Sequence, residues 1–142
     1  MTSGLDPLGE AALNEQERRV VDGIVSCLGE RLQADLLAVW LYGSRARGEA
    51  DPKETDPDLR SDIDLLAVVD SGVNVEAIRA WAQPMVEETA DAEGDSPVYY
   101  SLRVFDAEWL RQRREIHSFF IQEVDRDKRV LLDRTVEAAA HP

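Results

Sequence analysis

Two short segments of the chain carry residue types that bind phosphate and metal ions. Gly43 and Ser44 follow an apolar run at residues 36–42, and Asp62 and Asp64 begin a second apolar run. A glycine lets an anion approach the backbone, and a serine hydroxyl adds a hydrogen-bonding group. Two carboxylates close together supply the hard oxygen ligands that Mg²⁺ prefers. The two segments together predict a site for a triphosphate and its cation.

The first segment predicts a strand, a tight turn and a helix. Residues 36–42 are apolar and β-prone, and a helix that begins after Gly43 would direct unpaired N–H groups at phosphate oxygens. Arg45 and Arg47 are near enough in sequence to add charge-assisted contacts. Because residues two places apart on a helix point in different directions, at most one arginine is expected to face the phosphates. The sequence does not indicate which of the two arginines faces the phosphates.

The second segment predicts a buried strand at residues 62–69 with both aspartates on one face. Their Cα atoms would lie about 6.5–7 Å apart, so both carboxylates could reach one cation. Two unpaired carboxylates on an apolar strand repel each other and resist desolvation, and a divalent ion would offset both effects. The alternative is an exposed strand end at which Asp62 and Asp64 cap a turn.

Gly43-Ser44, followed by Ser-Asp-Ile-Asp-Leu at 61–65, resembles the signature of the minimal nucleotidyltransferases in the DNA polymerase β superfamily. Arg-Ala-Arg-Gly at 45–48 is also typical of that family. The resemblance implies that Gly43 and Ser44 hold the β- and γ-phosphates, and that Asp62 and Asp64 are catalytic and bind Mg²⁺, or Mn²⁺ in its place. It further implies transfer of a nucleoside monophosphate, with ATP as the expected donor, to an acceptor hydroxyl with release of pyrophosphate.

The chain departs from the family pattern in two places. Residues 51–60 form an insertion whose prolines and acids indicate a surface loop. Active relatives carry a third carboxylate on a later strand, and here the best match is Ser101 in the predicted strand 98–105. Loss of that acid is expected to slow transfer more than it weakens nucleotide binding. Asp95 or Asp106, just beyond the strand ends, could substitute for the third acid, but their ordinary roles as turn and helix-cap residues are favoured.

Arg103 shares the alternation of Ser101 and is therefore expected on the same face as the site. It could contact a phosphate, or it could form an ion pair with one of the many surface acids. The sequence leaves both interpretations open.

The remaining elements predict an α/β or α+β nucleotidyltransferase fold with a mixed sheet, helices packed mainly on one face and the site on the other. A first helix at 14–34 begins with the capping-box spacing of Asn14 and Glu17. The further elements expected are a helix at 75–90 interrupted by Pro84, helices at 106–114 and 118–127, and a short strand at 130–132. The domain is expected to span 14–134, between a loose N-terminus at 1–13 and a tail at 135–142.

Composition limits the classes of partner. The 142 residues, 44% of them hydrophobic, suffice for one core, and a formal charge of −13 argues against an extended nucleic-acid surface. One cysteine excludes an internal disulfide, and no apolar segment resembles a signal peptide or membrane span, which predicts a cytoplasmic protein. The sequence does not set the oligomeric state.

The resemblance also suggests partners. Small members of the family often act as antitoxins that add AMP to a tyrosine of a HEPN-domain toxin, which makes a HEPN-domain protein the expected partner. Modification of an aminoglycoside ranks lower, because the extra domain that usually completes a drug pocket is lacking. A different class of function is a nucleotide-binding or partner-binding module that has lost catalysis, and the missing third acid favours it.

Overall fold

The computed structural model describes residues 13–48, 62–94 and 98–134. The predicted insertion at 51–60, Ser61, Asp95 and the tail at 135–142 lie outside the described residues. Leu13, which we assigned to the loose N-terminus, is only 5% exposed and belongs to the core.

The first helix, α1 (Glu15–Leu32), begins where the capping box predicts. The Asn14 side chain accepts a hydrogen bond from the Glu17 N–H at 2.8 Å, and the Glu17 carboxylate accepts one from the Asn14 N–H at 2.9 Å. This reciprocal pair satisfies two backbone donors that a helix start leaves unpaired. A single turn of 3-10 helix, η2 (Gln33–Asp35), links α1 to the first strand.

The sheet contains four strands in the order β3-β2-β1-β4. The central strands are β1 (Leu36–Tyr42) and β2 (Ile63–Val69), which pair antiparallel. On the outside, β3 (Tyr100–Asp106) pairs parallel to β2, and β4 (Arg129–Asp133) pairs antiparallel to β1. The sheet is therefore mixed, as predicted.

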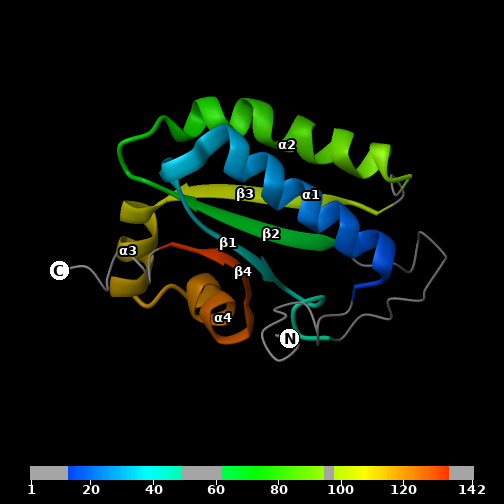
Figure 1. Ribbon diagram of the computed structural model, residues 1–142. Coiled ribbons are helices and arrows are strands. Elements are labelled where there is room, and N and C mark those ends of the chain that lie inside the picture. The colour runs from blue at the N-terminus through cyan, green and yellow to red at the C-terminus, as the bar shows by residue number, and fades with distance from the viewer. Residues whose placement is uncertain (1–12, 49–61, 95–97, 135–142) are drawn as a thin grey trace.

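Helices cover the two faces of the sheet unequally. The long helices α1 and α2 (Val75–Ala92) lie side by side over one face and bury the main core, as Figure 1 shows. The short helices α3 (Ala107–Glu115) and α4 (Phe119–Asp127) pack on the opposite face. The predicted placement of helices mainly on one face holds for the long pair, whereas α3 and α4 enclose part of the site face.

The edge of β3 is closed by side chains of α2. The Arg79 guanidinium donates to the Val104 carbonyl, with Nε 3.0 Å away. The Gln83 amide donates to the Tyr100 carbonyl at 2.9 Å and accepts from the Leu102 N–H at 3.2 Å. These bonds occupy the groups that an exposed edge strand would offer to another chain.

Two predicted helix features differ in the structure. No regular helix follows Gly43: residues 44–48 form turns, and the positive φ of 74° at Gly48 ends them. Conversely, α2 is not interrupted and continues through Pro84. Pro84 is exposed, so water can satisfy the carbonyl that loses its helical partner.

Among the described residues, no helix is both long and apolar enough to span a bilayer.

Candidate functional site

The two aspartates lie at the start of β2, and Asp64 is on the sheet face opposite α1 and α2. Ile63 and Leu65 are fully buried in the core under those helices. Because side chains alternate along a strand, the Asp64 carboxylate points to the other face. Asp62 precedes the strand, is exposed, and lies near enough to act electrostatically on Asp64. Asp64 therefore lies on the predicted face, and the exposed Asp62 lies just before the strand.

The turn after β1 meets the Asp64 carboxylate directly. Tyr42 is the register partner of Asp64, so Gly43 begins the turn beside it. A Cβ atom built at Gly43 would lie 2.7 Å from Oδ2 of Asp64, closer than real side chains allow. Gly43 also has a φ of 80°, in the left-handed region that favours glycine. The phosphate-type turn and the carboxylate therefore occupy one place on the molecule.

Backbone and side-chain bonds hold this turn in shape. The Arg47 N–H donates to the Gly43 carbonyl at 3.2 Å, and the Gly48 N–H donates to the Arg45 carbonyl at 3.2 Å. From β4, Arg129 donates through Nε to the Ala46 carbonyl at 2.9 Å. Ser44 is half-buried within this anchored segment.

Arg45 does not reach the site face. Its side chain is 1% exposed, and its Nη1 lies 2.8 Å from Oε1 of the fully buried Glu17 in α1. This position corrects our expectation that Arg45 could contact phosphate. In a turn rather than a helix, the side chain is directed toward α1, and the local sequence pattern does not encode a partner that lies in a different element.

Arg47 remains at the site and lines a cavity beside the turn. Its side chain is exposed, and Nη1 lies 3.8 Å from Oδ2 of Asp127. The cavity encloses about 180 Å³ and is lined by Tyr42, Gly43, Arg47, Phe120, Glu123 and Val124. The three residues from α4 were not predicted at the site, because an amphipathic pattern indicates a packed helix without specifying where it packs.

The electrostatics of the site favour a bound cation. Burial raises the pKa of the Asp64 carboxyl, and the Asp62 carboxylate raises it further, whereas Arg103 lowers it. Burial and Asp64 also raise the pKa of Tyr42 to about 12. Within the described part of the chain, neither aspartate has a hydrogen-bond or ion-pair partner. The two carboxylates therefore repel each other, and Arg103 offsets that repulsion only in part, because the pKa of Asp64 stays raised.

Ser101 lies next to Asp64 on the neighbouring strand. The parallel register pairs Asp64 with Ser101, so their side chains share the site face. Asp106, the nearby acid beyond β3, instead caps α3 and accepts from the Trp109 N–H at 2.7 Å. Its ordinary role as a helix cap is confirmed.

Arg103 lies on the same face, two register pairs further along the strands. It is exposed and is the register partner of Leu66. Its guanidinium carbon lies 5.6 Å from the centre of the Phe120 ring, which meets Tyr42 edge to face at 5.7 Å. The predicted alternative, an ion pair with a surface acid, is not found among the described residues.

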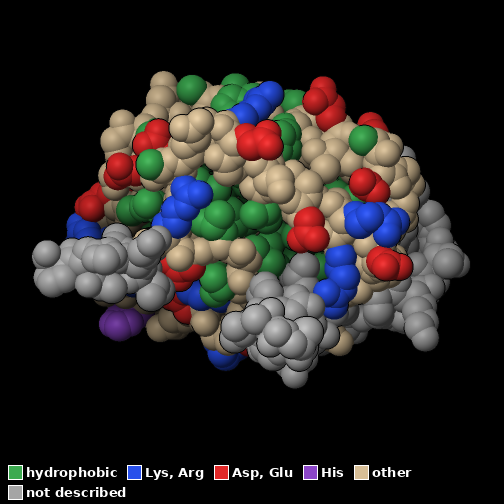
Figure 2. Space-filling model, viewed as in Figure 1, with side chains coloured by type: hydrophobic (Ala, Val, Ile, Leu, Met, Phe, Trp, Pro, Cys, Tyr) green, Lys and Arg blue, Asp and Glu red, His purple; other side chains and the backbone are tan. Residues whose placement is uncertain are grey.

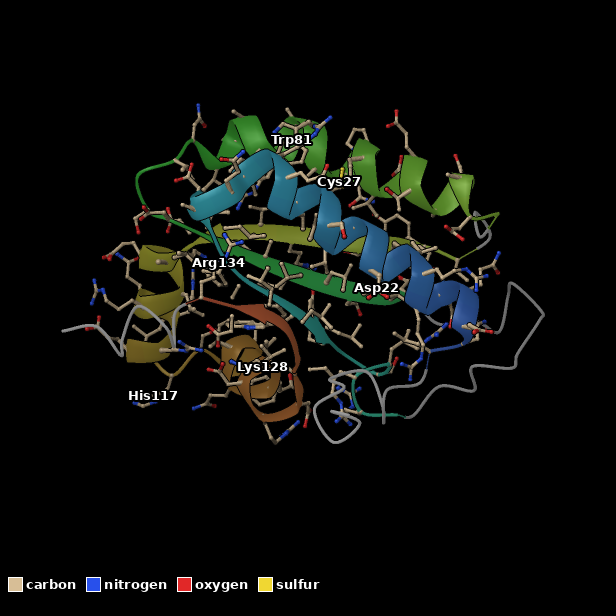
Figure 3. The ribbon with its side chains drawn as sticks, in the orientation of Figure 1. Asp22, Cys27, Trp81, His117, Lys128 and Arg134 are labelled. Carbon is tan, nitrogen blue, oxygen red and sulfur yellow. The ribbon has the colours of Figure 1, made fainter. Side chains whose placement is uncertain are left out.

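Away from the Asp64 end of the sheet, packed side chains cover the site face. Trp40 is 3% exposed, and Nζ of Lys128 lies 3.7 Å from the centre of its ring. Further along, Phe105 stacks on Trp109 with ring centres 3.7 Å apart. Figure 3 shows Lys128 near the end of α4 and His117 beyond α3.

The donor set fits one hard divalent cation. The Asp64 carboxylate beside Gly43 and the nearby Asp62 carboxylate can supply oxygen ligands, and phosphate oxygens and water can complete the shell. In the described ranges, no group of three or more His, Cys, Asp or Glu residues could hold a metal. The arrangement suits a cation that arrives with a phosphate ligand.

Comparisons with known proteins show the family of the chain. A sequence family described as "Nucleotidyltransferase domain" matches residues 21–137. Among solved structures, the chain is similar to a "putative nucleotidyltransferase" from Sulfolobus solfataricus, with 22% identity, 84% of this chain and 85% of that chain covered, and a TM-score of 0.48. No curated protein matches the chain.

Proposed function

Because the chain belongs to the nucleotidyltransferase domain family, which supports a nucleotidyl-transfer function, we propose that it transfers a nucleoside monophosphate from a magnesium-bound triphosphate to an acceptor hydroxyl. The acceptor oxygen bonds to the α-phosphorus, the bond from that phosphorus to the bridging oxygen breaks, and pyrophosphate leaves. The hydroxyl proton passes to solvent. ATP is the proposed donor, since the resemblance to minimal nucleotidyltransferases implies AMP transfer.

Each side chain at the site has a role in this proposal. Asp62 and Asp64 would hold the Mg²⁺, which supplies charge neutralisation for the triphosphate when bound. The Gly43-Ser44 turn would receive the β- and γ-phosphates, because a glycine lets their oxygens approach the backbone. Arg47 and Arg103, both exposed at this end of the sheet, would add charge-assisted hydrogen bonds.

One observation carries the proposal: the 2.7 Å approach of a Cβ at Gly43 to Oδ2 of Asp64. A cation held by Asp64 would lie within reach of a phosphate held by the turn. The raised pKa of Asp64 gives independent support, because a divalent cation would stabilise a carboxylate that burial and Asp62 disfavour.

The proposed acceptor is a tyrosine on a HEPN-domain partner, so that AMP addition would neutralise a toxin. This assignment rests on the family resemblance. The test is to co-express the chain with a candidate HEPN-domain partner and to determine the intact mass of that partner. A gain of one nucleoside monophosphate that disappears in the Asp62→Asn/Asp64→Asn variant supports transfer.

Ser101 in place of an acid favours a second candidate, a module that binds the nucleotide or the partner without chemistry. The same experiment separates the two candidates. If the partner gains no mass but is still neutralised, and neutralisation survives the double aspartate substitution, contact rather than catalysis is responsible.

A further inference from the structure

The site face carries a row of three polar side chains on neighbouring strands. Tyr42, Asp64 and Ser101 are register partners across β1, β2 and β3. A two-metal site needs carboxylates on both sides of the second cation. Here the side chain next to Asp64 is a hydroxyl, which is a weak ligand beside a carboxylate. The described residues thus provide the ligands of one cation.

A positive side chain lies close to the position that lacks the acid. Arg103 is two residues after Ser101 on the same face of β3, about 6.5–7 Å along the strand. It is near enough to Asp64 and Tyr42 to act on both electrostatically. Its long side chain can therefore extend toward a phosphate bound beside Asp64.

Arg103 differs from three of the four arginines of α3 and α4; the fourth, Arg113, also forms no ion pair among the described residues and lies over the Trp109 ring. Arg111, Arg114 and Arg126 all form ion pairs with carboxylates. Within the described ranges Arg103 forms none, although the whole chain carries a formal charge of −13. It is instead placed over the Phe120 ring, which positions a guanidinium without neutralising it. An unneutralised, positioned cation at the rim of an anion site is available for a ligand.

We propose that this site holds a single divalent cation, the one that accompanies the triphosphate, and that Arg103 supplies the positive charge of the second. The inference rests on the proposed function. Two carboxylates and one guanidinium carry a net charge of minus one, and one divalent cation brings the site to plus one. Three carboxylates with two divalent cations give the same plus one. Both sets of groups therefore present the same net positive charge to the triphosphate.

The test counts bound cations by electron paramagnetic resonance, with Mn²⁺ as the cation and α,β-methylene-ATP as a ligand that cannot be cleaved at the reacting bond. The chain is kept in excess over the analogue. We expect the spectrum of isolated Mn²⁺ from the native chain. Two Mn²⁺ ions about 3.5–4 Å apart would give a spin-coupled spectrum instead. We expect that coupled spectrum in the Ser101→Asp variant, which restores the third acid.

A second measurement addresses Arg103. At a fixed Mn²⁺ concentration, Arg103→Gln should weaken binding of the analogue about tenfold or more, and Arg103→Lys should restore part of the loss. Arg111→Gln, which removes an exposed arginine on α3 that lies outside the site, is the matched control and should leave the affinity unchanged.

The outcomes separate this inference from the proposed function. A spin-coupled Mn²⁺ pair in the native chain, or unchanged affinity in Arg103→Gln, would overturn the single-cation inference and leave nucleotide binding intact. Absence of any Mn²⁺-dependent binding of the analogue would overturn the proposed function and this inference together.

Discussion

Gly43 and Asp64 constrain each other at the centre of the site. The glycine is required twice, by its φ of 80° and by the 2.7 Å approach of a Cβ to Oδ2 of Asp64. The second requirement is chemical as well as steric, because any side chain there would displace the carboxylate that we assign to the cation. The turn at Gly43 and the first residues of β2 therefore depend on each other.

Gly43→Ala should therefore damage binding more than folding. We expect unfolding to become easier by about 1–2 kcal/mol from the left-handed backbone alone. Binding of Mn²⁺ and nucleotide should fall by at least about tenfold, because Asp64 must move. Calorimetric titration and thermal unfolding measure the two effects. Gly29→Ala is the control: this α1 glycine has open space around it, so the substitution should stabilise the helix and leave binding unchanged. Unaltered binding in Gly43→Ala would contradict the close approach.

The raised pKa of Asp64 predicts a pH dependence of stability in the absence of divalent cations. Between the ordinary value of 3.8 and the raised value, the folded chain binds more protons at Asp64 than the unfolded chain. Ionisation of Asp64 therefore costs more in the folded chain than in the unfolded chain. The free energy of unfolding is not reduced by this group at low pH, and it falls as the pH rises through that window. Asp64→Asn should unfold at a higher temperature than the native chain at pH 7, and the difference should vanish in acid.

Asp70→Asn, at an exposed acid just after β2, is the control for this comparison. A thermal unfolding series over pH for the three proteins, with chelator present, measures the effect. If Asp64→Asn is less stable than the native chain at pH 7, the carboxylate has a stabilising partner and the account of its electrostatics is wrong.

At the scale of elements, α1 and the phosphate turn are joined by a buried ion pair. Arg45 and Glu17 are 1% and 0% exposed and 2.8 Å apart. Glu17 also completes the capping box, so one carboxylate both starts α1 and holds the turn. The start of the helix therefore helps to set where Gly43 and Ser44 lie.

Removal of one partner should leave an uncompensated buried charge. Glu17→Gln retains a side-chain oxygen for the capping box, yet we expect it to destabilise the fold by about 3–5 kcal/mol. Where the protein remains folded, the KM for nucleotide should rise because the turn is no longer fixed. Arg19→Gln breaks the exposed pair with Glu93 at 3.2 Å and should cost less than about 1 kcal/mol. Equal losses in the two variants, by chemical denaturation, would contradict the anchoring role.

The elements show which features a sequence encodes locally. The strand at 36–42 and the cap at Asn14 were predicted to the residue, because apolar runs and capping spacing are local signals. The absence of a helix after Gly43 was missed; the turn there is also bonded by Arg129 of β4, at the Ala46 carbonyl, and a local pattern does not encode that distant contact. The buried position of Arg45 was missed for the same reason: its partner is 28 residues away.

At the scale of the whole molecule, negative charge dominates. The formal charge is −13, and Figure 2 shows basic side chains scattered among acidic ones on the visible face. This distribution agrees with a small anionic ligand that brings its own cation, rather than with a nucleic-acid surface. It also predicts self-repulsion in the folded state.

Salt should therefore stabilise the fold. Raising NaCl from about 0.02 M to about 0.5 M shortens the Debye length to a few ångströms and should raise the unfolding temperature. Thermal unfolding at constant pH measures the shift. A fall in unfolding temperature over this range would show that attractive ion pairs outweigh the net repulsion.

The central claim, that the Gly43 turn and the two aspartates form one cation-dependent nucleotide site, is tested most directly by calorimetric titration of the intact chain. The titrant is α,β-methylene-ATP, with Mg²⁺ or with chelator, against the native chain and the Asp62→Asn/Asp64→Asn variant. We predict one binding event that requires Mg²⁺ and that weakens by about a hundredfold or more in the variant. Equal affinity in the variant and the native chain would contradict the claim.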